Sequence, residues 1–114
     1  MKIVFKLSAL ALFAWSATVS AGSVSSAKIT AVRVDSSGFG MMFFDKPLTT
    51  PAACVPAGAV SRMSFDTKSP GGQAMLSIAL SAQVSGKTVT VTGTKSCLQY
   101  TTSVESANYL TINN

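Results

Sequence analysis

The first twenty-one residues constrain the rest of this chain most strongly, because their pattern is typical of an export signal. Lys2 and Lys6 make the start positive, an apolar run follows over residues 7–19, and residues 19–21 (Val-Ser-Ala) offer a small-residue cleavage site. The apolar run is shorter than the roughly 20 residues that a membrane-spanning helix needs. We therefore expect the folded part to begin at Gly22, in the periplasm or outside the cell, where disulfides form.

Residues 22–114 are enough for one domain with a modest core, and they contain no internal repeat. Loss of Lys2 and Lys6 with the signal lowers the net charge from +5 to +3, and the remaining cations are scattered along the chain. A weak, dispersed positive charge argues against a nucleic-acid or anionic membrane surface. The sequence thus predicts a signal peptide over 1–21 and one domain over 22–114, with no nucleic acid and no membrane span after cleavage.

The chain has two cysteines, Cys54 and Cys97. In an oxidising compartment, an even pair in a small domain indicates a disulfide. The alternative is a redox-active or metal-binding pair, which is disfavoured because there is no Cys-x-x-Cys spacing and the chain has no histidine. We therefore expect a structural disulfide, no metal and no cofactor.

Short alternating or apolar runs, bounded by turn residues, predict five strands. These runs cover residues 28–34, 39–44, 59–65, 87–92 and 108–112. Alternation places Met63 and Phe65 of the third strand, and Val89 and Val91 of the fourth, toward the core. The serine-rich stretch over 22–27 is expected to be loose.

One helix is expected between the third and fourth strands, over residues 73–85, where apolar residues recur at helical spacing. Ser69 and Pro70 can serve as the N-cap and first helical residue. Gly86 suits a left-handed C-terminal cap. Because this helix carries no charge, we expect it to lie against a sheet or a partner on much of its circumference.

Three strands, a helix and two further strands follow the element order of an OB-fold. The sequence therefore predicts a mostly β, α+β domain. It would be a small OB-like five-stranded antiparallel barrel, with one helix between strands three and four and one disulfide. The apolar face of the helix would close one end of the barrel. The alternative is an open α+β sheet with the same helix on one face.

The segment from Gln73 to Val91 (QAMLSIALSAQVSGKTVTV), with Cys54 before it and Cys97 after it, resembles the helix–strand–cysteine core of a toxin family. That family comprises the B subunits of subtilase-cytotoxin-type AB5 toxins, and small exported bacterial proteins with the same layout are more similar still. The order of elements is similar over most of residues 28–112. Only the segment from Cys54 to Cys97 resembles that family in a specific way. It implies an OB-fold, an intramolecular disulfide, a ring-shaped homopentamer and binding of cell-surface glycans. No sugar-contacting residue is carried over.

Catalysis of the familiar kinds is disfavoured by composition. Without histidine, a Ser-His-Asp or Cys-His site cannot form. The carboxylates are Asp35, Asp45, Asp66 and Glu105, and the three aspartates lie in turns or loops, where an Asp side chain commonly bonds to the nearby backbone. Glu105 precedes the last strand and is expected to be solvated rather than functional. The sequence therefore predicts that the protein is not an enzyme.

Two non-catalytic functions remain, and the first is an exported binding module for a glycan or a protein. Tyrosine and hydroxyl side chains suit sugars because they offer a flat apolar face and hydrogen bonds. The candidate ligand contacts are Gln99, Tyr100, Thr101, Thr102 and Tyr109. An ordinary threonine-rich β surface would show the same residues. The cluster of Phe39, Phe43 and Phe44 offers a stacking platform as well, although core packing is the simpler interpretation.

The second function is a periplasmic structural or interaction protein that docks to a partner through its uncharged helix. This interpretation allows a homo-oligomer, as the toxin resemblance does. It predicts association through the apolar residues of the helix or through the serines at Ser77 and Ser81.

Overall fold

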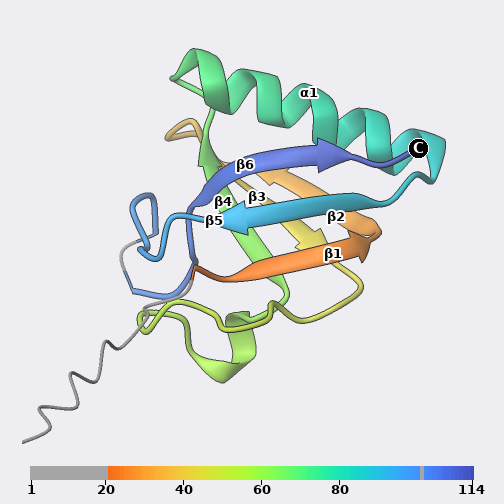
Figure 1. Cartoon of the computed structure of the whole chain (residues 1–114). Coiled ribbons are helices and arrows are strands. Elements are labelled where there is room, and N and C mark those ends of the chain that lie inside the picture. Colours follow the sequence, from red (N-terminus) through yellow and green to blue (C-terminus); the bar gives the residue numbers. More distant parts are fainter. Residues whose placement is uncertain (1–20, 101) are drawn as a thin grey trace, which may run out of the picture.

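The computed structural model describes residues 21–100 and 102–114, which form six strands, one short 3-10 helix and one long α-helix (Figure 1). In chain order the elements are β1 (Ser23–Ala27), β2 (Ile29–Val34), β3 (Phe39–Phe44), η1 (Ala57–Ala59), β4 (Arg62–Asp66), α1 (Pro70–Ser85), β5 (Val89–Gly93) and β6 (Ala107–Ile112). All of the predicted signal peptide except Ala21 lies outside the described residues.

The strands form two three-stranded antiparallel sheets, in the orders β1-β5-β6 and β2-β3-β4. The predicted five-stranded barrel is therefore wrong. Only Lys28 separates β1 from β2, so the chain passes directly from one sheet to the other. On the opposite side, β4 approaches the start of β6 through one isolated parallel bridge, Ser64 to Ser106. In the described residues no ladder of hydrogen bonds joins the two sheets into a closed barrel.

The extra strand is the serine-rich stretch, and the prediction that it would be loose is wrong. Val24 and Ala27 are buried while Ser25 and Ser26 are exposed. Val24 pairs with Val91 of β5, which supplies backbone partners that the sequence of the stretch does not reveal. The register shifts between Val24 and Ala27, and Ser26 has a left-handed φ of 51°. This distortion lies within β1, just before the chain passes through Lys28 to β2.

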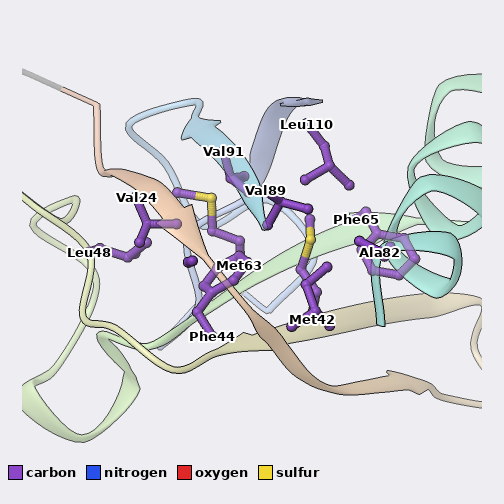
Figure 2. Close-up of a cluster of buried hydrophobic side chains, with 13 residues drawn as sticks. Val24, Met42, Phe44, Leu48, Met63, Phe65, Ala82, Val89, Val91 and Leu110 are labelled. Carbon is purple, nitrogen blue, oxygen red and sulfur yellow. The ribbon is translucent and has the colours of Figure 1, made fainter. Parts of the chain in front are cut away.

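The core lies between the two sheets (Figure 2). Met63 and Phe65 of β4 are buried, as are Val89 and Val91 of β5, so the predicted inward positions are confirmed. Side chains from both sheets point into one interior, and Ala82 of α1 joins them. The core is thus a single cluster to which both sheets and the helix contribute.

The helix is confirmed, and it begins three residues earlier than predicted. Ser69 is the N-cap, its Oγ accepting a hydrogen bond from the Gly72 N–H at 3.1 Å, and Pro70 is the first helical residue. Gly86 ends the helix in the left-handed conformation, with φ 70°. α1 packs on β2, β4 and β6, so it covers strands of both sheets (Figure 1).

The predicted disulfide is also confirmed. Cys54 and Cys97 are bonded, with their Cα atoms 6.3 Å apart. Cys54 belongs to the long connection between β3 and β4, and Cys97 to the connection between β5 and β6. The bond therefore ties together two irregular segments that lie far apart in the sequence.

Candidate functional site

A hollow of about 160 Å³ lies where the N-terminus of α1 meets the end of β4 and the connection before β6. It is lined by Phe65, Asp66, Ser69, Gly71, Gly72, Met75, Gln99 and Ala107. Ligand cavities for drug-sized molecules measure about 300–1,000 Å³. The hollow can therefore hold one chemical group of a ligand whose remainder lies on the surface.

The polar groups at the helix N-terminus are largely occupied. Ser69 Oγ donates to the Asp66 carbonyl oxygen at 2.9 Å while it caps Gly72. The Lys68 N–H donates to Asp66 Oδ1 at 2.9 Å. Gly71 is exposed, and its N–H belongs to the first helical turn, which has no acceptor within the helix. The backbone of Gly71 therefore offers a donor at the rim of the hollow.

Gln99 supplies the other donor. The buried Ser64 hydroxyl donates to Gln99 Oε1 at 2.8 Å, which fixes the orientation of the amide. Within residues 21–100 and 102–114, no hydrogen bond uses the Gln99 Nε2 group. With Phe65 and Met75 as apolar lining, the hollow presents N–H donors beside a small apolar surface. A hydroxyl or carbonyl group next to an apolar face fits this arrangement.

The other predicted contacts do not line the hollow. Tyr109 is 53% exposed on β6, and Thr102 is exposed in the connection before it. Thr101 lies outside the described residues. The Tyr100 hydroxyl donates to Asp35 Oδ2 at 2.5 Å and lies 3.2 Å from the Phe39 carbonyl oxygen. Tyr100 thus holds the turn between β2 and β3, and of the predicted residues that the structure describes only Gln99 lines the hollow.

The contact between Tyr100 and Asp35 shifts the titration of both groups. Burial, followed by the hydrogen bond to Asp35, raises the pKa of Tyr100 to about 12. The hydrogen bond from Tyr100, followed by the one from Arg33, lowers the pKa of Asp35 below its ordinary value. Arg33 Nε donates to Asp35 Oδ1 at 2.7 Å, in an ion pair exposed to solvent.

We expect this contact to make stability depend on alkaline pH. The folded protein holds the Tyr100 proton more tightly than the unfolded chain, whose tyrosines titrate at about pH 10. The stabilisation is therefore complete below about pH 10 and is lost as the pH rises toward about 12. Urea unfolding across this range should show a steeper decline for the wild type than for Tyr100→Phe. Equal slopes for the two proteins would contradict the expectation.

The phenylalanine cluster divides between core and surface. Phe44 is buried, whereas Phe39 and Phe43 are half-buried. The Arg62 guanidinium lies 5.5 Å from the Phe43 ring centre, and Lys68 Nζ lies 4.3 Å from that of Phe39. Each ring therefore has a cation–π contact with a side chain of the same molecule. These rings are therefore not a free stacking platform.

Glu105 is the residue whose surroundings differ most from those predicted from the sequence. It is 0% exposed, so the expectation of a solvated carboxylate is wrong. It accepts hydrogen bonds from backbone N–H groups of three segments that are distant in sequence, at Gly22, Ala52 and Lys95. The residues that line the hollow near α1 were also not predicted as a site. The sequence Ser69-Pro70-Gly71-Gly72 was a usable sign of a helix N-terminus without large side chains.

Comparisons with known proteins give no family for the chain. No match was found among protein-family models, curated proteins or solved structures. No helix in the described ranges has the length and apolar character to cross a membrane. In the same ranges, no three His, Cys, Asp or Glu side chains gather where they could hold a metal ion. The function therefore has to be inferred from the hollow and the surfaces around it.

Proposed function

We propose that this protein is an exported, non-catalytic binding domain that recognises glycans, with the hollow at the N-terminus of α1 as its contact point. The observation that carries the proposal is the Gln99 amide, which Ser64 holds through Oε1 and whose Nε2 group has no hydrogen-bond partner among the described residues, in a hollow that the exposed Gly71 also lines. Sugars present hydroxyl oxygens beside apolar C–H faces, and the hollow presents donors beside Phe65 and Met75. Its small volume suits a terminal group of a glycan rather than an enclosed ligand.

Two further observations support this choice. The disulfide between Cys54 and Cys97 suits an oxidising compartment, in agreement with the export pattern of residues 1–21. The resemblance of the segment from Gln73 to Val91 to toxin B subunits favours cell-surface glycans over other small ligands. Asp66 is the single ionisable residue in the lining, which gives the hollow no acid–base pair for catalysis.

A glycan-array screen of the oxidised chain from Gly22 to Asn114 tests the proposal. The Gly71→Gln variant should place an amide side chain at the rim of the hollow without disturbing the fold, because a Cβ atom at Gly71 would meet no neighbouring atom within 4 Å. We expect it to weaken glycan binding at least tenfold, or about 1.4 kcal/mol. Gly58→Gln is the matched control, since Gly58 also has open space around it and lies outside the hollow.

The other outcomes of this screen discriminate between sites and functions. If Gly71→Gln binds as well as the wild type while Tyr109→Ala does not bind, the glycan site lies on β6 and the hollow is not used. If the wild type binds no glycan, the proposal fails. The alternative is then a protein partner that docks on α1, where Leu80 is 44% exposed and Val84 is 88% exposed.

A further inference from the structure

The carboxylate of Glu105 is completely enclosed and is held by backbone N–H groups. The Gly22 N–H donates to Oε2 at 2.9 Å, the Ala52 N–H to Oε1 at 2.7 Å and the Lys95 N–H to Oε2 at 3.4 Å. These contacts join the start of β1, the long connection before β4 and the connection after β5. Glu105 is therefore the centre on which three separate segments meet.

What this centre lacks is a positive charge. Among the described residues, Arg33 forms an ion pair with Asp35, and no cationic side chain forms one with Glu105. Burial of an ionised carboxylate is costly unless a cation or enough hydrogen bonds compensate for it. A free amino group at Gly22 would supply such a cation, because the Gly22 nitrogen already lies 2.9 Å from Glu105 Oε2.

We propose that cleavage between Ala21 and Gly22 creates an α-ammonium group at Gly22 that pairs with the buried carboxylate of Glu105. This inference rests on the export signal proposed above. A signal peptidase would hydrolyse the peptide bond, with the hydroxyl of water going to the Ala21 carbonyl carbon and a proton to the Gly22 nitrogen. The amine then takes a further proton from solvent and becomes the cation. Processing thus completes the charge balance of the folded domain.

The position of the Gly22 nitrogen is fixed by residues that remain after cleavage. The Gly93 N–H donates to the Gly22 carbonyl oxygen at 2.8 Å. Ser23 exchanges two hydrogen bonds with Thr49, at 3.1 Å and 2.7 Å, and pairs with Thr92 of β5. None of these contacts involves residues 1–21. The new ammonium therefore forms where the amide nitrogen is now.

Two glycines lie close against this carboxylate. A Cβ atom at Gly22 would overlap Glu105 Oε1, and one at Gly93 would overlap Oε2. A larger residue after the cleavage site would thus push the Glu105 carboxylate from its observed position, whereas glycine lets the backbone approach it closely. This constraint is independent of what the peptidase accepts.

The decisive experiment is a double-mutant cycle with two recombinant chains, one that starts at Gly22 and one in which Gly22 is acetylated at its nitrogen. Glu105→Gln is introduced into each chain, because the amide keeps an acceptor oxygen and removes the charge. We expect Glu105→Gln to raise the unfolding equilibrium constant at least tenfold more in the free-amine chain than in the acetylated one. Equal effects in both chains would overturn the ion pair.

A second measurement does not depend on whether Glu105→Gln folds. In the wild-type chain that starts at Gly22, an acylating reagent should modify the α-amine at least tenfold more slowly than in urea, with peptide mapping separating this amine from the lysines. A chain that starts at Ala21 is the matched control, and its displaced α-amine should not be protected in this way. Equal rates for the folded Gly22 chain and its unfolded form would also overturn the ion pair. N-terminal sequencing of exported protein tests the cleavage separately, since these recombinant chains do not need it.

Discussion

Replacing Cys54 and Cys97 together by serine is expected to lower the free energy of unfolding by about 4 kcal/mol. The disulfide closes a loop between cysteines that are 43 residues apart, and loss of this closure gives the unfolded chain more conformations. Small domains have a total stability of about 5–15 kcal/mol. The double variant should therefore be close to unfolding at growth temperature. Urea unfolding of oxidised protein, followed by circular dichroism, gives the measurement.

The location of the bond explains why the fold depends on it. Cys54 lies in a connection that contains Pro47, Pro51 and Pro56, none of which can donate a backbone hydrogen bond. The same connection supplies the Ala52 N–H to the buried Glu105. Reduced wild-type protein should match the double-serine variant, because both lack the covalent closure. A loss below about 1 kcal/mol in both would show that contacts within the connection suffice without the bond.

The elements that could be predicted from the sequence are those that neighbouring residues determine. β3 was predicted with its observed ends, because turn residues bound its apolar run on both sides. The caps of α1 at Ser69, Pro70 and Gly86 were predicted because each acts on its own turn of backbone, although the helix was expected to begin only at residue 73. The disulfide followed from the count of two cysteines and the export signal. None of these predictions needed knowledge of distant residues.

The elements that were predicted wrongly depend on residues that are far away in the sequence. β1 is serine-rich and forms a strand because β5 supplies its hydrogen-bond partners. β1 and β2 are separated only by Lys28 and yet belong to different sheets, which the element order could not indicate. At the site, Gln99 was predicted from its chemistry alone. Its partner Ser64 and the other lining residue Gly71 belong to other elements, and only the tertiary fold brings them together.

Replacing Gly72 by alanine is expected to cost about 3 kcal/mol of unfolding free energy, although alanine is the better helix former. Gly72 is buried in the first turn of α1, where a Cβ atom would overlap the backbone carbonyl group of Asp66. A backbone atom cannot rotate away as a side chain can, so the helix start or the end of β4 must shift. Such a shift would also break the 3.1 Å cap between the Gly72 N–H and Ser69.

Gly71 is the matched control for this substitution, because it precedes Gly72 in the same turn and has no atom near its Cβ position. Gly71→Ala should lose no stability and gain up to about 1 kcal/mol from helix propensity. Urea unfolding of both variants measures the difference, and equal values would show that the helix start adjusts without cost. A large loss confined to Gly72→Ala would mean that close contact between α1 and the end of β4 shapes the hollow. The floor of the hollow is then a product of tertiary packing, whereas a side chain at Gly71, on the rim, alters the proposed glycan contact without a loss of stability.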